Sequence, residues 1–484
     1  MHLGDCLGGY IFYDDKYENM IEEPRYVEQD DITKNVFSAD SRILEINSKS
    51  GLYPLYMAYG IYRTRLKEKY PDGNFELEQQ LQIWDSVVAE NIFVICKTPM
   101  AKSITRRTLV GFRNAKVNTR YFEDLINQIT NKTANFVEKV QQGKSYWKSN
   151  NNDNMKFNAI VGNPPYQVMD GGNKASAIPA YNLFVDVAKK INPDYISMII
   201  PAKWYNGGRG LDDFRTAMLN DTRIKKLVDY EDSNDCFNGV DIAGGVCYFL
   251  WDKLYSGLCY VVNIKNGKSF KQERKLFEYK TFIRESKALS IIEKIKKRES
   301  KFLNSKVSSR KPFGLATNVK PNREGNLVLR FNGGKGKFKE TEVLSGINWI
   351  NKWKVITSYL TYDHAGRADK EGKRRIISTL EILTPNEICT ETYIVIDAFD
   401  TKYEAVSLYN YIKTKFCRFL ILQITSTQHI TKSNYALVPL QNFTSSSDIN
   451  WNKPVSDIDR QLYVKYGLTE EEAAFIESMI KPME

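Results

Sequence analysis

The stretch FNAIVGNPPY, residues 157–166, determines how the first half of this chain is expected to fold. Its first five residues contain a short apolar run that predicts a buried β-strand. Pro164 and Pro165 cannot donate a hydrogen bond to a neighbouring strand, so the strand is expected to end before them. The amide oxygen of Asn163 and the carbonyl oxygen of Pro164 are then predicted to point outward at the carboxyl end of the strand, where open α/β folds bind ligands.

Further predicted strands and helices surround this motif. Apolar runs predict strands at residues 42–45, 91–96, 195–200 and 225–229, and helical spacing predicts helices at 52–65 and 181–190. Such strands alternating with helices indicate a mainly parallel sheet that is covered on both faces. The runs at 244–251 and 259–264 are expected to form two adjacent strands at an edge of the sheet.

The pattern changes after about residue 265. A basic helix and glycine-rich loops come first, and a strand at 394–399 followed by the amphipathic segment 403–422 predicts one further compact α/β unit. The polar segment 444–451 is predicted to be a linker, and Thr469 with Glu472 forms a capping box that begins a final helix. We therefore expect three parts, at residues 1–265, 266–443 and 444–484.

The composition is that of a soluble globular protein, because 42% of the 484 residues are hydrophobic and 26% are charged. No apolar stretch approaches the roughly 20 residues of a membrane span, and the N-terminus lacks the pattern of a secretory signal. A cytoplasmic protein without a membrane partner is therefore expected. The seven cysteines form no Cys-x-x-Cys pair and there are only three histidines, which argues against a disulfide framework, a metal site and a Ser-His-Asp triad.

The positive charge of the chain is concentrated in one segment. The whole chain has a net charge of +11, whereas residues 271–340 alone contain 20 Lys and Arg against seven Glu and no Asp, a balance of +13. The rest of the chain is therefore close to neutral. A basic segment of this size is an electrostatic footprint for phosphate groups, although a solvated basic surface would have the same composition.

The chemistry of the motif suits a planar amine. The oxygens of Asn163 and Pro164 are two hydrogen-bond acceptors, and Tyr166 adds an aromatic face beside them. The exocyclic amine of adenine is weakly nucleophilic because its lone pair is delocalised into the ring. Two hydrogen bonds accepted from that amine favour a more tetrahedral nitrogen and free the lone pair for attack, which requires positioned acceptors rather than a titrating base.

Asn163-Pro164-Pro165-Tyr166 resembles the catalytic motif of the S-adenosylmethionine-dependent DNA adenine-N6 methyltransferases of restriction–modification systems. The segment 42–51 lies where this family has its cofactor loop, and the segments 195–210 and 236–251 resemble its later motifs. This order, with the recognition domain last, is the family's gamma arrangement. The resemblance implies an α/β fold: a Rossmann-like class I methyltransferase domain with a mixed, mainly parallel sheet, followed by an α+β target-recognition domain.

The resemblance also implies roles for individual residues. Asn163 and Pro164 would hold the amine of an adenine flipped out of the duplex, and Pro165 would keep the motif rigid. Tyr166 and Phe237 would stack on the flipped base and repay part of the cost of unstacking it. The residues implied for binding S-adenosylmethionine are Pro24, Glu45, Ile46, Asn47 and Gly51.

The cofactor loop departs from the family's pattern at two positions. The pattern is acid-Pro-x-x-Gly-x-Gly, but Ile46 replaces the proline and Lys49 replaces the first glycine. A side chain at Lys49 would either crowd the cofactor or point to solvent. An acid for the ribose hydroxyls is not evident after the strand that ends at Cys96, and Asp153 is the nearest candidate acid for the adenine ring.

We predict a site-specific DNA adenine methyltransferase that acts on double-stranded DNA, with a restriction endonuclease or another restriction–modification component as partner. The cations expected at the DNA are Lys203, Arg209, Arg310, Lys311 and Lys335. A catalytically silent DNA-recognition subunit is one alternative, which the altered loop favours and the intact motif disfavours. A protein glutamine N-methyltransferase is the other, which the basic segment disfavours because a protein amide needs no phosphate-binding domain.

Overall fold

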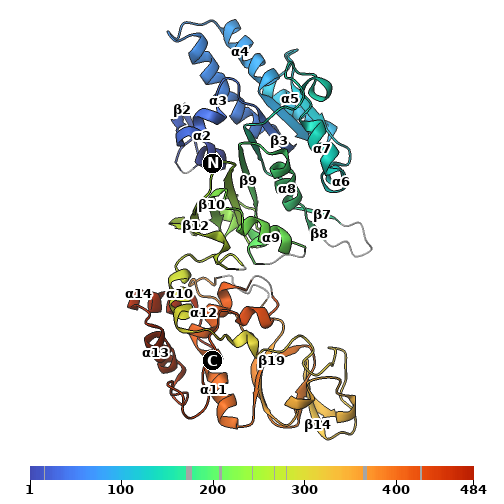
Figure 1. Ribbon diagram of the computed structural model, residues 1–484, viewed down its shortest axis with the longest axis vertical. Helices are drawn as coiled ribbons and strands as arrows, with labels where there is room; N and C mark the ends of the chain where they lie inside the picture. Colours follow the sequence, from blue (N-terminus) through green and yellow to red (C-terminus); the bar gives the residue numbers. More distant parts are fainter. Residues whose placement is uncertain are drawn as a thin grey trace. The chain divides into compact units, whose positions relative to one another are not determined.

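The computed structural model describes residues 1–15, 17–169, 177–206, 210–242, 244–265, 267–279, 281–362, 368–425 and 428–483. The chain forms two compact units, Met1–Lys280 and Thr281–Glu484 (Figure 1). Each unit has its own sheets and helices and is described by itself.

A nine-stranded sheet forms the centre of the first unit. In spatial order its strands are β13 (Lys268–Arg274), β12 (Cys259–Lys265), β10 (Ile224–Tyr230), β11 (Val246–Asp252), β9 (Tyr195–Pro201), β6 (Ala159–Gly162), β3 (Ile43–Ser48), β4 (Ile92–Cys96) and β5 (Asn118–Tyr121). The neighbours β9, β6, β3, β4 and β5 pair in parallel, whereas β11 is antiparallel to both β9 and β10. The predicted α/β fold with a mixed, mainly parallel sheet is confirmed.

Helices cover both faces of this sheet (Figure 1). The side chains of α1 (His2–Leu7), α3 (Leu52–Lys69), α4 (Leu77–Glu90) and α5 (Pro99–Val110) share one apolar cluster on one face. The helices α6 (Leu125–Asn131), α7 (Thr133–Val140) and α8 (Tyr181–Ile191) pack against one another on the other face. The helix α9 (Asp212–Leu219) lies next to α8, since the rings of Phe214 and Tyr181 are 6.0 Å apart.

The N-terminal segment adds elements that the apolar pattern did not predict. The strands β1 (Gly9–Tyr13) and β2 (Met20–Val27) form an antiparallel hairpin, and α2 (Asp30–Val36) follows it. The hairpin packs against α3, where the guanidinium of Arg63 lies 4.8 Å from the ring centre of Tyr10. A second short hairpin, β7 (Gln167–Met169) with β8 (Ala177–Pro179), follows the proline motif.

Two expectations for this sheet were wrong or incomplete. The strands β11 and β12 are not neighbours at an edge, because β10 lies between them and β13 forms the edge. A continuous apolar run shows that a strand is buried, but it does not show which strand lies beside it. The strand β5 was missed because it is polar, yet its Asn118 is buried and donates hydrogen bonds to the carbonyls of Ala89 (2.7 Å) and Ile92 (3.1 Å).

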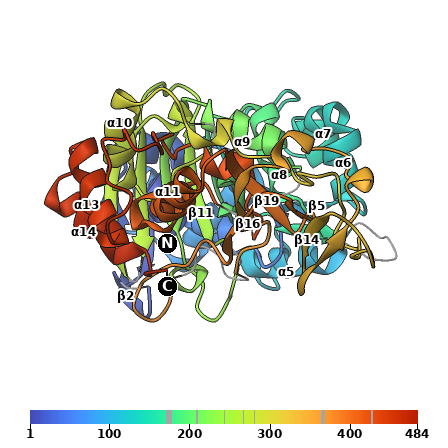
Figure 2. The same cartoon turned by 90° about the horizontal axis from the view of Figure 1, so that it is seen from below.

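The second unit contains two three-stranded sheets and several helices. One sheet has the order β15 (Gly334–Phe338), β14 (Leu327–Phe331), β18 (Glu387–Cys389), and the other has the order β17 (Leu380–Leu383), β16 (Trp353–Ser358), β19 (Tyr393–Phe399). The helices are α10 (Ala288–Arg298), α11 (Lys402–Lys413), α12 (Lys415–Gln423), α13 (Val455–Tyr466) and α14 (Glu470–Met479). Within this unit, α13 and α14 lie at the opposite end from β14 (Figure 2).

The second unit differs from the sequence-based expectation in two places. The units divide at Lys280 rather than at residue 265, because β12 and β13 continue the sheet of the first unit. The amphipathic region 403–422 forms two helices, since Thr414 ends α11 and caps α12 by accepting a hydrogen bond from the amide of Cys417. The segment 444–451 is not a free linker, because Trp451 is buried and donates to the carbonyl of Asn442. The capping box at Thr469 is confirmed.

Candidate active site

The carboxyl ends of the parallel strands bring the predicted site residues to one edge of the sheet. The strands β3 and β6 are direct neighbours, with Glu45 in register with Val161. A Cβ atom built on Gly162 would lie 3.8 Å from Cγ of Glu45. The motif that begins at Asn163 therefore starts beside the cofactor loop, as parallel pairing requires.

The four residues of the proline motif follow β6 directly. Asn163 is half-buried, and its side-chain amide has no hydrogen-bond partner within the described parts of the chain. Pro164 is buried and Pro165 is half-buried, so this turn is held in place by packing. The backbone carbonyl of Tyr166 accepts a hydrogen bond from the amide of Ala180, which leads into α8. The acceptors of the motif are thus positioned but not consumed by the protein.

Two aromatic residues predicted to stack on the base share one apolar environment. Tyr166 from the motif and Phe237, which follows β10, both pack against the apolar cluster that underlies α3. The hydroxyl of Tyr166 is buried without a hydrogen-bond partner among the described residues. Burial and the neighbouring Cys236 thiol raise the pKa of Tyr166, so the phenol remains neutral at all ordinary pH values.

The cofactor loop contains two buried polar side chains that lack partners. Glu45 is 6% exposed and Asn47 is 3% exposed. Within the part of the chain that the structure describes, Oε2 of Glu45 and Nδ2 of Asn47 have no hydrogen-bond partner. Burial raises the pKa of Glu45 to about 8, although a hydrogen bond from Ser48 opposes the shift. A buried carboxyl oxygen and a buried amide nitrogen without partners cost free energy, and such atoms are typical of ligand sites.

The backbone of the loop is bent at two residues. Asn47 has a φ of 77°, which interrupts the pairing of β3 with β4 between Ile46 and Ser48. Ile46 is buried on the strand side of this bend. Gly51 has a φ of 78° and forms the N-cap of α3, and a Cβ atom there would lie 3.0 Å from Cα of Thr105 in α5. The close approach at Gly51 is therefore an approach between two helices.

Replacing Gly51 with alanine is expected to destabilise the protein and weaken cofactor binding together. The positive φ costs about 1 kcal/mol for an L-residue, and the contact with Thr105 adds about 1 to 3 kcal/mol of overpacking. Gly73→Ala is the matched control, because Gly73 has a φ of 73° and no atom within 4 Å of its built Cβ. Thermal unfolding of the two variants checks the difference, and equal losses would show that Gly51 is needed only for its backbone angle.

The departures from the family's loop pattern have simple structural outcomes. Lys49 is exposed, so its side chain points to solvent and does not crowd the loop. After β4, Thr98 caps α5 by accepting a hydrogen bond from the amide of Ala101 at 3.1 Å. Asp153 is exposed and accepts hydrogen bonds from the amide and hydroxyl of Ser145. Glu123, which follows the unpredicted β5, is a further exposed acid at the carboxyl edge of the sheet.

Pro24 lies in a different setting from the other predicted cofactor residues. It is half-buried in β2, which pairs with β1, and β1 packs against the middle of α3. Its role in cofactor binding stays a prediction.

Two residues at the site were not singled out from the sequence, His2 and Tyr53. Tyr53 is the second residue of α3, off the apolar face that helical spacing indicated. Its pKa is raised by burial and then by Glu45 and Tyr166, so both groups are near enough to act on its charge. The ring of His2 from α1 lies 5.2 Å from that of Tyr53. The position of Tyr53 two residues after Gly51 is a sequence signal that could have identified it. The sequence contains no such signal for His2.

The predicted DNA-contacting cations of the second unit are paired with carboxylates. Arg310 and Lys311 both approach Glu391, at 3.2 and 3.7 Å, and Lys335 lies 2.8 Å from Glu387. A phosphate contact by any of these three cations must compete with an existing ion pair.

Lys203 is the predicted DNA contact of the first unit that the structure describes. It is exposed just after β9, at the same edge of the sheet as Asn163. Arg209 lies outside the described residues. The DNA roles of all five cations stay predictions.

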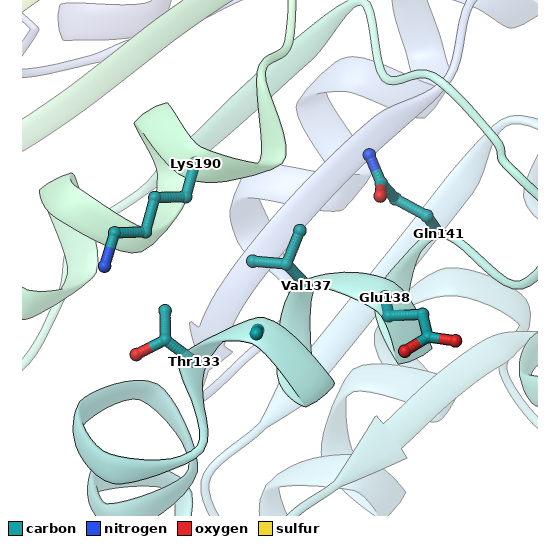
Figure 3. Close-up of a pocket in the computed structure, with 6 residues that line it drawn as sticks. Thr133, Val137, Glu138, Gln141 and Lys190 are labelled. Carbon is teal, nitrogen blue, oxygen red and sulfur yellow. The ribbon is translucent and has the colours of Figure 1, made fainter.

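A surface depression of about 540 Å³ lies away from the carboxyl edge of the sheet. It is lined by α7 and by Lys190 near the C-terminal end of α8 (Figure 3). Because α8 ends at Ile191, just before β9 begins, this end of the helix lies at the amino edge of the parallel strands. The depression is therefore not part of the candidate site.

Other kinds of site are absent from the part of the chain that the structure describes. No group of three or more His, Cys, Asp or Glu side chains there could hold a metal ion. All seven cysteines are free. No described helix has the length and apolarity needed to cross a membrane.

The chain is similar in sequence to known methylases over the region that contains the proline motif. Residues 90–237 match the family model of the Eco57I restriction-modification methylases. The matched range contains Asn163–Tyr166 and Phe237 and excludes the loop from Glu45 to Gly51. An "uncharacterized adenine-specific methylase" of Mycoplasma pneumoniae (strain ATCC 29342 / M129 / Subtype 1) is 35% identical over 161 residues, which span 29% of this chain and 37% of the relative.

Solved structures with a similar chain path are distant in sequence. A nuclease-deletion mutant of the Type ISP restriction-modification enzyme LlaGI, in complex with a DNA substrate mimic, is 10% identical, with a TM-score of 0.48 over 89% of this chain and 45% of that one. The Type IIL restriction-modification enzyme MmeI in complex with DNA is 9% identical, with a TM-score of 0.45 over 91% of this chain and 68% of that one. Neither likeness bears on function.

The cofactor that the methylase family and the fold imply is S-adenosylmethionine, which carries a positive sulfonium and amine and a negative carboxylate. The loop fits such a molecule: the unpartnered Oε2 of Glu45 suits a cationic group, and the unpartnered amide nitrogen of Asn47 suits an oxygen acceptor. Together with the match over residues 90–237, this confirms the resemblance of the chain to the adenine methyltransferases of restriction–modification systems.

Proposed function

We propose that this chain is a site-specific DNA adenine methyltransferase that methylates N6 of an adenine flipped out of duplex DNA. The observation that carries the proposal is the adjacency of two strand ends. The acceptors of the Asn163–Tyr166 motif, which have no partner among the described residues, follow β6, and Glu45 with its unpartnered Oε2 lies on the neighbouring β3. A planar amine held by the first would lie beside a cationic donor held by the second.

The residues of the motif would act by positioning and by accepting hydrogen bonds. Asn163 Oδ1 and the Pro164 carbonyl would each accept one N–H of the adenine amine, which directs the nitrogen lone pair away from the ring. The rings of Tyr166 and Phe237 would hold the base by stacking, and each such contact is worth about 1 to 3 kcal/mol. S-adenosylmethionine, when bound, supplies the electrophilic methyl group.

The methyl transfer requires no general base with a perturbed pKa. A bond would form between N6 and the methyl carbon while the bond from that carbon to sulfur breaks. The methylated nitrogen would then carry a positive charge and lose one of its protons to solvent. Asn163 Oδ1 and the Pro164 carbonyl remain as acceptors for the charged nitrogen throughout, which stabilises it in the transition state.

A restriction endonuclease is the proposed partner, and the cytoplasm the proposed location. The name of the matched family, restriction-modification methylase, supports a partner from such a system. The exposed Lys49 removes the crowding argument for a catalytically silent subunit. The basic segment, which belongs mainly to the second unit, supports DNA over a protein amide as substrate.

The decisive experiment is methylation of a random duplex library with isotopically labelled S-adenosylmethionine, followed by mass spectrometry of the nucleosides. Label in N6-methyladenine supports the proposal, and sequencing of the methylated molecules reports the target. Binding of the cofactor without label in any base would favour the silent subunit. Label in glutamine of added protein would favour the amide methyltransferase.

The paired and unpaired cations of the second unit should differ in their effect on DNA binding. Lys320 and Lys337 are exposed along the edge strand β15, where the amide of Asn322 bonds to the carbonyl of Lys337 at 2.8 Å. No carboxylate among the described residues lies within ion-pair distance of either lysine. Each phosphate contact contributes about 0.9 to the slope of log affinity against log salt.

Lys320→Gln with Lys337→Gln is therefore expected to lower that slope by up to about 1.8. The matched control is Lys311→Gln with Lys335→Gln, which removes the same charge, takes Lys335 away from Glu387 and leaves Glu391 paired with Arg310 alone. We expect the control pair to change the slope less, because these lysines are already neutralised in the free protein. Titration of duplex DNA over a range of salt concentrations checks both, and a larger change in the control pair would assign the phosphate contacts to the paired lysines.

A further inference from the structure

The first helix of the chain is held firmly against the candidate site. Asp5 in α1 accepts a hydrogen bond from Tyr248 at 2.8 Å and forms an ion pair of 2.6 Å with Lys226. Leu3 and Leu7 of the same helix are buried in the cluster that underlies α3. These contacts fix α1 on β10 and β11, so the position of its other side chains is determined as well.

His2 is the residue of α1 that reaches the site. Its ring lies between two aromatic rings, 5.2 Å from Tyr53 and 5.6 Å from Tyr248. Its Nδ1 lies 3.4 Å from the hydroxyl oxygen of Tyr53. Burial lowers the pKa of His2 to about 3, so the imidazole is neutral at physiological pH. In that form it adds no positive charge beside the phenol.

Tyr53 connects this histidine with the donor side of the site. It follows Gly51 at the start of α3, and the carboxyl of Glu45 and the phenol of Tyr166 are close enough to act on its charge. Its own hydroxyl stays protonated because burial raises its pKa. The carboxyl of Glu45 can therefore ionise, while the phenols of Tyr53 and Tyr166 stay neutral.

We propose that Tyr53 forms an aromatic wall of the methyl-donor site and that His2 is a positioning residue that holds this wall in place. The inference rests on the proposed function, which supplies the donor. A sulfonium cation is stabilised by a carboxylate and by the faces of aromatic rings. S-adenosylhomocysteine, the product, has a neutral sulfur and gains nothing from either at that atom. The wall thus favours the charged donor over the spent product.

The test measures binding of S-adenosylmethionine and of S-adenosylhomocysteine to the full chain by isothermal titration calorimetry. Tyr53→Leu is expected to weaken binding of the charged donor about tenfold, and to change binding of the product about twofold or less. Tyr53→Phe keeps the ring but loses its contact with His2, so we expect a smaller loss, about threefold, again confined to the donor. Equal losses for the two ligands, or no loss, would overturn the proposal.

The role of His2 is tested by rescue. His2→Leu keeps the bulk of the side chain and removes the polar contact, and it is expected to reproduce the loss seen for Tyr53→Phe. His2→Asn places an amide oxygen the same number of bonds from the backbone as Nδ1, and it should restore the preference for the donor. A purely structural role of His2 would leave the ratio of the two affinities unchanged in all of these variants and would overturn its assignment.

Tyr56→Phe is the matched control on the same helix. Tyr56 also joins α3 to the N-terminal segment, by donating to the carbonyl of Gly8 at 2.7 Å, but Glu45 is not among the groups that act on its charge. We expect its ratio of donor to product affinity to equal that of the wild type. A changed ratio in Tyr56→Phe would show that the effect of the Tyr53 and His2 variants comes from a loosened α1 and not from the aromatic wall.

The wild-type protein separates the two proposals. Binding of the donor without methylation of any DNA would contradict the proposed function and leave the aromatic wall measurable through the variants. Methylation with unchanged ligand preference in the variants would contradict the aromatic wall alone. If the wild type bound neither ligand, both proposals would fall.

Discussion

Asn163→Ala is expected to lower the rate of methyl transfer by about 10²- to 10³-fold, the effect of removing one preorganised hydrogen-bonding group from a polar transition state. The side chain of Asn163 lies at the end of β6 without a partner among the described residues, so its removal leaves no protein group unsatisfied. Stability and cofactor affinity should therefore be unchanged. Single-turnover methylation at saturating S-adenosylmethionine, with duplex binding measured in parallel, checks this expectation.

Two further variants separate the acceptor from the shape of the side chain. Asn163→Asp keeps an acceptor oxygen at the same position and should retain more activity than the alanine variant. Asn163→Gln moves the oxygen by one methylene group and should be nearly as slow as alanine, because the hydrogen bond depends on its geometry. Equal activity in the wild type and Asn163→Ala would remove Asn163 from the reaction.

Glu45→Gln is expected to weaken binding of S-adenosylmethionine by roughly 10- to 100-fold at pH 9, the usual contribution of a buried charge-assisted interaction. In the free protein burial raises the pKa of Glu45 to about 8, so the carboxyl is mainly protonated at neutral pH. A bound cation favours the carboxylate, and binding must then release a proton. Wild-type affinity should therefore rise with pH, by at most about tenfold per unit below about pH 8, and level off above it.

Glu45→Gln also serves as the control for the pH dependence of the wild type, because glutamine does not titrate. Calorimetry in buffers of different ionisation enthalpy should show proton release near pH 7 for the wild type and less for Glu45→Gln, any remainder coming from the ligand. A flat wild-type profile, or the same profile in both proteins, would show that Glu45 does not bind the cationic group.

Glu45 should also oppose the stability of the free protein at alkaline pH. Its pKa is raised in the folded state, so the folded protein holds a proton that the unfolded chain releases between about pH 4.5 and 8. The stability linked to that proton is present below this window and is lost as the pH rises through it. Glu45→Gln is therefore expected to melt at a higher temperature than the wild type at pH 9 while binding the cofactor more weakly, a trade that is typical of functional sites.

Local sequence was sufficient to predict the edge of the sheet that carries the candidate site. The strands that form it are buried on both faces and therefore appear as continuous apolar runs, as in residues 91–96 and 195–200. Pro164 and Pro165 end their strand at a predictable point because neither can donate to a neighbour. Parallel pairing then brings Glu45 and Asn163 to the same edge, and this part of the site follows from topology alone.

Features that depend on partners distant in sequence could not be predicted in this way. The polar strand β5 is buried only because Asn118 finds carbonyl acceptors on the segment around β4. The order of β10, β11 and β12 depends on which hydrogen-bonding edges meet, which side-chain polarity does not encode.

The amino-acid sequence by itself determined the α/β class, the position of the acceptor motif and the basic character of the segment 271–340, because each is a property of contiguous residues. The tertiary structure decided which charged groups and aromatic rings are free to contact a ligand. It pairs Lys311 and Lys335 with Glu391 and Glu387, and it places His2 of the first helix against Tyr53, 51 residues later. Such contacts join segments that only folding brings together, so they are set by packing and burial.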